Sequence, residues 1–386
     1  MLQVGQSLEK DLIELRQYLH KYPELSYKEF KTTETIIEWF DKLGLKPVDF
    51  GLETGVVFDI EGGLDGHSIA LRGDIDALPM QEENNSPYKS SFPRIMHACG
   101  HDMHAAALVG AGTLLYENRD RLKGKVRLLF QPGEEVATGA KYMCEHGVLE
   151  GVDAIFGIHN LPALPVGSIG IKSGGLMAGV DRFKVVFNGR GGHAGVPHKA
   201  IDPVIIASEY VTNIQNIISR KIDLFDNAVI SVTHIQGGST WNIIPDEVFI
   251  EGTVRTFQKR NRRFIPLQMK KYAYGIAESN GGYADFYWEG LHPVVDNFPL
   301  FRKPLEDLAI ELGYQPVEAK PTSAGEDFSF FQEQIPGFFV FIGIEGTEAW
   351  HSPIYNMKDE ALKVAVEFLA NIPNKVNEIE FAKTVL

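Results

Sequence analysis

The chain has 386 residues, of which 44% are hydrophobic and 23% are charged. This length exceeds what one hydrophobic core usually supports, so two domains are expected. The formal net charge of −14 argues against a nucleic-acid partner, because phosphate backbones are bound by clustered Lys and Arg.

The N-terminal segment, residues 1–21, mixes charged residues with its leucines and shows neither a secretory signal nor a membrane-spanning run. The two cysteines, Cys99 and Cys144, are too few for a disulfide framework. We therefore expect a cytoplasmic protein with no membrane partner. A reducing compartment would keep Cys99 available as a thiolate ligand.

The first half of the chain alternates between helical and extended patterns. Apolar residues recur at helical spacing in 8–19 and 27–43, and the second run ends at Gly44, a typical stop signal. Another helical stretch, 105–116, lies among short apolar runs typical of buried strands. This alternation predicts an α/β sheet flanked by helices. The predicted strands are 55–60, 68–72, 125–130 and 154–158.

Polar side chains stand at or near the end of three of these runs. Asp74 and Asp76 follow the second run, Glu134 and Glu135 the third, and His159 the fourth. Because α/β folds gather their functional groups beyond the carboxyl ends of strands, we expect these side chains to lie close together.

The segment 180–291 has a different order, βαββαβ, which predicts an inserted ferredoxin-like satellite domain. After residue 299 the pattern returns to helix, strand and helix. We therefore expect a larger domain with a mixed central sheet, formed by 1–179 and 292–386. The predicted satellite strands are 182–188, 228–235, 247–257 and 283–288, and its helices are 201–219 and 266–278.

Residues 97–104 contain three imidazoles and one thiol. Thiolate, imidazole and carboxylate are the groups that hold zinc and related divalent cations, and a carboxylate beside a ligand supplies the base for metal-assisted hydrolysis. The combination indicates a metal site. The candidate groups are the thiol and imidazoles of this block, Cys99, His97, His101 and His104, together with Glu134, Glu135, His159 and His351.

Several sequence blocks resemble those of the M20 family of metal-dependent amidohydrolases, in the branch of hippurate hydrolases, auxin-conjugate hydrolases and N-acyl-amino-acid deacylases. The chain departs from the usual pattern at Gly73 and Gly133, where Ala is commoner, at Trp350, where Leu is usual, and at Asn356, where an acid is common. The blocks are 16–24, 71–79, 97–104, 131–135, 157–160, 189–194, 242–245, 252–255, 324–328 and 350–356.

The resemblance implies a dinuclear centre of divalent ions such as zinc, manganese, cobalt or nickel, in a metal-binding catalytic domain. Glu134 would be the catalytic base that assists a metal-bound water in hydrolysing the amide of an N-acyl amino acid. The implied ligands of the two ions are Cys99, His101, Glu135, His159 and His351.

The resemblance also implies roles for the inserted domain, which would act as a lid and as the dimerisation surface of a homodimer. His193 would reach the active site of a partner subunit and stabilise the oxyanion. Asn242 and Arg255 would bind the substrate carboxylate, for which the planar guanidinium is well suited. Gly325 would let backbone approach the substrate.

The remaining polar residues of these blocks are expected to have supporting roles. Asp76 is expected to orient a ligand histidine, because metal-bound imidazoles usually donate their other N–H to a carboxylate or carbonyl. His97 and His104 are predicted to be structural, and Asp102 to be a helix N-cap. His20 and His292 are among the histidines predicted to lie on the surface or in packing.

Other functions fit less well. Residues 189–194 match G-x-G-x-x-A, a dinucleotide-binding pattern, but Pro197 and Pro203 intervene where an NAD-binding loop would open into a helix. A binding module with a structural metal would need no spare acid such as Glu134. Within the hydrolase class, an N-acetyldiaminopimelate-type deacetylase and a dipeptidase remain alternatives.

Overall fold

The computed structural model describes residues 1–381, which divide into two compact units. Unit 1 begins with Met1–Leu176 and resumes at Asp296–Lys320 and again from Asp327 onward, whereas unit 2 comprises Met177–Val295 and Pro321–Glu326. Most of unit 2 is therefore one segment inserted into the sequence of unit 1. The domain limits given by the sequence stay a prediction, and residues 382–386 lie outside the described part.

Unit 1 contains a sheet of eight strands in the order β1-β2-β4-β3-β5-β16-β6-β15. Strands β4, β3, β5 and β16 run parallel, while β2 and β6 are antiparallel to their inner neighbours. The predicted mixed sheet is confirmed. Its strands are β1 (Pro47–Val48), β2 (Val56–Glu61), β3 (Ile69–Asp74), β4 (Lys125–Gln131), β5 (Ala154–Leu161), β6 (Ser168–Ile171), β15 (Gln315–Glu318) and β16 (Gly337–Gly343).

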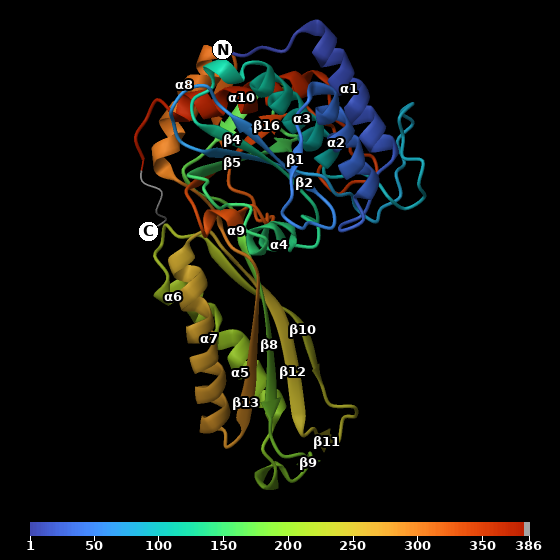
Figure 1. Cartoon of the computed structure of the whole chain (residues 1–386). Helices are drawn as coiled ribbons and strands as arrows, with labels where there is room; N and C mark the ends of the chain where they lie inside the picture. The colour runs from blue at the N-terminus through green and yellow to red at the C-terminus, as the bar shows by residue number, and fades with distance from the viewer. Residues whose placement is uncertain (382–386) are drawn as a thin grey trace. The chain divides into compact units, whose positions relative to one another are not determined.

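Helices cover both faces of this sheet, with α1, α3 and α10 on one face and α4 and α9 on the other (Figure 1). Two-sided cover explains why the central strands read as continuous apolar runs. The helices are α1 (Gln6–Lys21), α2 (Phe30–Leu43), α3 (His101–Glu117), α4 (Gly139–Glu145), α8 (Arg302–Glu311), α9 (Ser329–Gln332) and α10 (Glu360–Val376), with single 3-10 turns at Arg119–Arg121 and Pro299–Phe301.

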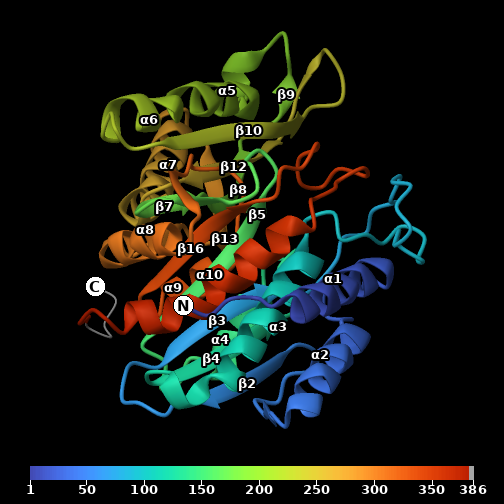
Figure 2. The same ribbon diagram turned by 90° about the horizontal axis from the view of Figure 1, so that it is seen from above.

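Helix α3 occupies the middle of its layer, between α1 and α10, as Figure 2 shows from above. It is buried on all sides from His101 to Leu115, because it packs on the sheet below and on helices beside it. A helix so enclosed must be apolar all round, which the run of Ala, Leu, Val and Gly provides. This placement fixes the start of α3, where His101 lies, against the sheet.

Unit 2 is an antiparallel sheet in the order β10-β12-β8-β13 with helices packed on it. The predicted βαββαβ order is confirmed. The elements are β8 (Gly179–Asn188), α5 (Pro203–Asn213), α6 (Gln215–Lys221), β10 (Ala228–Gly237), β12 (Glu247–Thr256), α7 (Lys259–Ser279) and β13 (Tyr283–His292), with a 3-10 turn at Pro197–Lys199.

Two pairs of short strands complete the described chain. Strand β9 (Gly192–His193) pairs with β11 (Ile243–Ile244) in a ribbon of unit 2. Strands β7 (Gly174–Met177) and β14 (Val295–Asn297) lie where the chain passes from one unit to the other. Among residues 1–381, no helix combines the length and apolar character needed to cross a bilayer.

Candidate metal centre

The candidate site lies at the carboxyl ends of neighbouring parallel strands of unit 1. Asp74 ends β3, Glu134 follows β4, and His159 lies near the end of β5. Since β3 pairs in parallel with both β4 and β5, these ends meet at one edge of the sheet. The structure thus gathers the polar groups where the sequence predicted them.

Cys99, His101 and His159 form the first group of potential ligands. One ligand atom from each lies within 4.8 Å of the others, and all three residues are buried. The Cys99 Sγ atom is 3.4 Å from Nε2 of His159. Segments sixty residues apart therefore present a sulfur and two imidazole nitrogens to one point.

Glu135 and His351 form the second group, together with the same Cys99. Glu135 Oε2 is 3.5 Å from His351 Nε2, and Glu135 Oε1 is 3.9 Å from His101 Nε2. One carboxylate thus faces both histidines. All five predicted ligands are close together, in two overlapping groups that share Cys99.

Buried polar atoms in this cluster suit a cation. His101 Nε2 and Glu135 Oε1 have less than 1 Å² of exposed surface and no hydrogen-bond partner among the described residues. Burying such atoms without a partner costs free energy, whereas a cation between them would satisfy both. The donor set therefore fits divalent metal ions.

The pKa shifts of His159 and Cys99 bear on how this cluster could hold a cation. Burial, followed by the charge of His104, places the pKa of His159 well below its usual value, so this imidazole is neutral and can bind a cation. Burial raises the pKa of the Cys99 thiol well above its usual value, and His101 offsets this only in part. A thiolate at this position therefore needs additional positive charge beside it.

His351 adopts a backbone conformation that non-glycine residues rarely adopt. Its φ is +62°, in the left-handed region, and its N–H donates to the carbonyl of Ala98 at 2.9 Å. That bond ties the segment of His351 to the segment of Cys99. Strained backbone of this kind persists where the surrounding contacts determine it, as at binding sites.

Asp76 contacts two of the proposed ligands. His101 Nδ1 lies 3.0 Å from the Asp76 carbonyl oxygen and 3.1 Å from its Oδ1 atom, so this nitrogen can donate and Nε2 is left to face the cluster. The other carboxylate oxygen accepts from the Glu135 N–H at 3.0 Å and from the Ser26 hydroxyl at 2.7 Å. Asp76 thus lies where the orienting role expected of it requires.

Glu134 is buried beside this cluster, and one of its carboxylate oxygens lies within 4.8 Å of ligand atoms of His101 and Glu135. The turn after β4 therefore sends two successive glutamates toward the same point. In an extended strand their side chains would diverge, so the turn is what allows one to face the ligands and the other to lie beside them.

His97 and His104 lie outside the ligand groups that share Cys99. His104 Nδ1 is 2.6 Å from Asp74, and its Nε2 accepts from the Asn160 N–H at 3.0 Å, so both ring nitrogens are used. Burial lowers the pKa of His97 to about 4, which keeps its ring neutral. His104 has the contacts expected of a structural histidine, whereas the two buried ring nitrogens of His97 have no hydrogen-bond partner among the described residues.

The remaining predicted site residues belong to unit 2. His193 pairs with Ile243 across the β9–β11 ribbon, and the Ala194 N–H donates to the Asn242 carbonyl at 3.1 Å, so His193 and Asn242 share one exposed ribbon. This ribbon stands where an NAD-binding loop would need a helix, which removes that alternative. The α5 helix begins only at Pro203.

Arg255 and Gly325 are the other two predicted residues of unit 2, and His292 is near both. Burial, followed by the charges of Arg255 and Arg262, lowers the pKa of His292 to about 4. A Cβ atom on Gly325 would lie 1.9 Å from His292 Nδ1, so no other residue fits there without a shift. His292, predicted to be a surface or packing residue, thus packs closely against Gly325.

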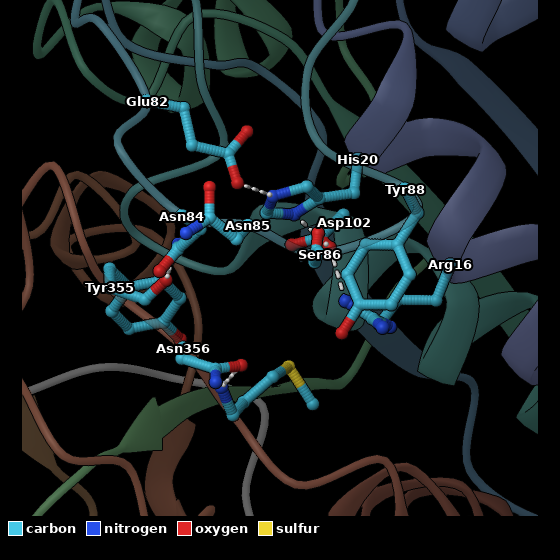
Figure 3. Close-up of a pocket in the computed structure, with 11 residues that line it drawn as sticks. Arg16, His20, Glu82, Asn84, Asn85, Ser86, Tyr88, Asp102, Tyr355 and Asn356 are labelled. Carbon is cyan, nitrogen blue, oxygen red and sulfur yellow. Dashed lines mark hydrogen bonds and ion pairs between the residues drawn. The ribbon is translucent and has the colours of Figure 1, made fainter.

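The sequence also missed a buried polar cluster beside the start of α3. Asp102 is not a helix N-cap, because Gly100 has that position; Asp102 instead lies 2.9 Å from His20 Nδ1 and 3.3 Å from Arg16 Nη1. His20 also contacts Glu82 at 3.3 Å, and these residues line a cavity of about 230 Å³ (Figure 3). Arg16 and His20 on the apolar face of α1 were the available signal.

Comparison with known proteins gives a consistent result. Residues 70–375 match the description of peptidase family M20/M25/M40. The chain is 48% identical to an N-acetylcysteine deacetylase of Bacillus subtilis over 94% of its length and 95% of the relative's. It is 38% identical to an IAA-amino acid hydrolase of Arabidopsis thaliana over 91% of its length and 82% of the relative's.

A solved structure resembles the chain over nearly its full length. The Bacillus subtilis YXEP protein, described as a dinuclear metal binding peptidase from the M20 family, superposes with a TM-score of 0.88 at 45% identity. The match covers 97% of this chain and 99% of that one. The chain belongs to peptidase family M20/M25/M40.

Proposed function

We propose that the protein hydrolyses the amide bond of N-acyl amino acids, releasing a carboxylic acid and a free amino acid. The observation that carries this proposal is the gathering of Cys99, His101, Glu135, His159 and His351 in two overlapping groups, with Glu134 buried beside them. Relatives named for hydrolysis of N-acetylcysteine and of indoleacetyl amino acids support it.

The five converging residues would hold two divalent ions, for which zinc, manganese, cobalt and nickel are the candidates. Such a pair, when bound, polarises a carbonyl and lowers the pKa of water. Two features support two ions rather than one. The ligand atoms form two groups rather than one, and the name of the YXEP relative specifies a dinuclear centre.

Glu134 is proposed as the general base and then the general acid. Its carboxylate takes a proton from the water whose oxygen attacks the amide carbon, and it returns that proton to the amine nitrogen as the carbon–nitrogen bond breaks. Proton transfer by a positioned carboxylate typically contributes about 10²–10⁴ in rate. The burial of Glu134 beside the ligands supports this role.

The second unit is proposed to complete the site in a homodimer. His193 of one subunit would stabilise the oxyanion in the other, Asn242 and Arg255 would bind the substrate carboxylate, and Gly325 would let the protein backbone approach the substrate. The exposed edge of β10, which pairs only with β12 among the described strands, supports a dimer contact. Residues 180–291 would then serve as lid and dimerisation domain to a catalytic domain of 1–179 and 292–386, in the cytoplasm.

A substrate panel tests the proposal. The protein, loaded in turn with zinc, manganese, cobalt or nickel, is assayed on acetyl, benzoyl and indoleacetyl amino acids, together with N-acetyldiaminopimelate and dipeptides. We expect acyl amino acids to be hydrolysed only in the metal-loaded protein. Activity on dipeptides or N-acetyldiaminopimelate alone would replace the proposal with one of those alternatives, and inactivity on the whole panel would favour a binding module.

A further inference from the structure

Asn160 follows the proposed ligand His159 on β5, and its polar groups are bonded to two distant segments. Its side-chain amide donates to the carbonyl of Cys99 at 2.6 Å, and its backbone N–H donates to His104 Nε2 at 3.0 Å. Its Oδ1 atom accepts from the Tyr355 hydroxyl at 2.8 Å and from the Trp350 indole N–H at 3.0 Å. The residue is fully buried, so no water competes for these bonds.

Two of these bonds lie at or next to a proposed ligand, and the bonds to His104 and Tyr355 reach the same two segments. The Cys99 carbonyl belongs to a ligand residue, and Trp350 directly precedes the ligand His351. The Asn160 carbonyl lies 2.8 Å from Nδ1 of His159, which fixes this nitrogen as the donor and leaves Nε2 to face Cys99. One asparagine therefore joins the segments that carry four of the five ligands: Cys99, His101, His159 and His351.

Trp350 adds a second restraint on the same imidazole. The centroids of the Trp350 and His159 rings are 4.7 Å apart at 66°, and the His104 ring lies at the same distance from His159. Phe341 packs against Trp350, with the ring centroids 6.3 Å apart. The leucine usual at this position could supply neither the indole N–H nor the aromatic contact.

We propose that Asn160 and Trp350 are positioning residues that hold the His159 ring and the backbones of Cys99 and His351 at one cation site. The inference rests on the proposed cation site but not on any particular substrate. Hydrogen-bonded partners behind metal ligands typically contribute about 10–100-fold to metal affinity, because they fix ring orientation and tautomer. In this chain the restraint on His159 is shared between the adjacent Asn160 and Trp350, which lies 190 residues beyond Asn160.

The test compares cobalt binding in three variants of the full chain. Trp350→Phe removes the indole N–H and keeps an aromatic ring, whereas Trp350→Leu removes both. Trp39→Phe is the matched control, because Trp39 is also half-buried in unit 1 and its indole donates to Thr113 at 3.0 Å. The dissociation constant for Co²⁺ is measured by chelator competition, the visible absorption of bound Co²⁺ is recorded, and the melting temperature is followed without metal.

We expect Trp350→Phe to weaken Co²⁺ binding by about tenfold and Trp350→Leu by about 100-fold, with altered cobalt absorption. The control should bind Co²⁺ as the wild type does, even if its melting temperature falls. Wild-type affinity and absorption in both Trp350 variants would overturn the proposal, as would a wild-type protein that binds no Co²⁺. A chain that binds Co²⁺ with these differences but hydrolyses no N-acyl amino acid would leave the positioning role standing and refute the proposed function.

Discussion

The imidazole of His20 and the carboxylate of Asp102 are both buried and lie 2.9 Å apart. Asp102 directly follows the proposed ligand His101. Burial alone would lower the pKa of His20, but Asp102 and then Glu82 raise it to about 9. The Asp102 carboxyl, although buried, has its pKa held below the usual value, first by the charge of His20. This pair is therefore ionised at neutral pH and supports the start of α3 electrostatically.

The first prediction concerns pH. Because the folded pKa of His20 lies above its unfolded value of about 6.5, its contribution is complete below pH 6.5 and is lost as the pH rises through about 9. The shift corresponds to about 3 kcal/mol of unfolding free energy. We expect His20→Gln to lower the melting temperature of the metal-free protein at pH 6 and to have a much smaller effect at pH 9.5. His198→Gln, at an exposed position, is the control; an equal effect of His20→Gln at both pH values would contradict the assignment.

A second prediction concerns metal removal. A cation that binds only the folded chain stabilises it by about 4 kcal/mol at a thousandfold excess over its dissociation constant. Chelation should therefore lower the melting temperature, and adding Zn²⁺ or Mn²⁺ should restore it. Cys99→Ser should reduce the rise in melting temperature that metal addition causes. Cys144→Ser should not reduce it, because Cys144 belongs to none of the ligand groups found in the described chain. If metal raised the melting temperature of the Cys99 variant as much as that of the wild type, Cys99 would not be a metal ligand.

Glu134→Gln is predicted to separate catalysis from metal binding. The amide keeps the size of the side chain but cannot accept a proton, so turnover should fall by at least about 10²–10⁴-fold. The Glu134→Gln variant should keep the metal content of the wild type. Glu135→Gln, which alters a proposed ligand, should lower the metal content. Glu145→Gln, at an exposed position of α4, serves as the control for each assay. A metal-loaded Glu134 variant with normal turnover would exclude Glu134 as the base.

The proposed role of His193 across the dimer predicts complementation. Glu134→Gln and His193→Ala should each be inactive alone. Mixed after dissociation and reassociation, they should recover about a quarter of wild-type activity, since half the dimers are then mixed and each has one site with both groups intact. Recovery would not occur if His193 served its own subunit, and the mixture would stay inactive.

Gly100 provides a prediction on stability. Its φ is +81°, and an added Cβ would lie 2.4 Å from the Tyr355 hydroxyl and 2.5 Å from Asn160 Nδ2. Gly151 also has positive φ, +74°, but an added Cβ there would meet nothing within 4 Å. Gly151→Ala should cost about 1–2 kcal/mol through backbone strain alone. Gly100→Ala should cost clearly more, as judged by thermal unfolding, and equal losses would show that the close approach is unimportant.

The sequence predicted the parts of the fold that depend on repeated local patterns. The two opening helices were found from their apolar spacing, and α2 ends at Gly44 with φ +83° as the stop signal indicated. The short strands β6 and β15 were missed, because a strand of four residues carries too little periodicity to be recognised. Their place depends on pairing with segments far away in the chain.

In the candidate site, too, features that depend on local residue types were predicted, whereas contacts between distant segments were not. The five ligands could be proposed because their residue types are unusual in combination, and they lie within one cluster. No pattern in the sequence indicated that Trp350 contacts His159 or that Asp102 pairs with His20. Those contacts join segments 191 and 82 residues apart, and only the folded chain brings them together.

The order of the ligands along the chain has a consequence for synthesis. Cys99, His101, Glu135 and His159 leave the ribosome well before His351, and most of unit 2 is made between them. Domains tend to fold as units during translation, so unit 2 can fold while the cation cluster still lacks its last member. A chain interrupted before residue 351 would therefore carry an incomplete centre, which delays any hydrolytic activity until translation is almost finished.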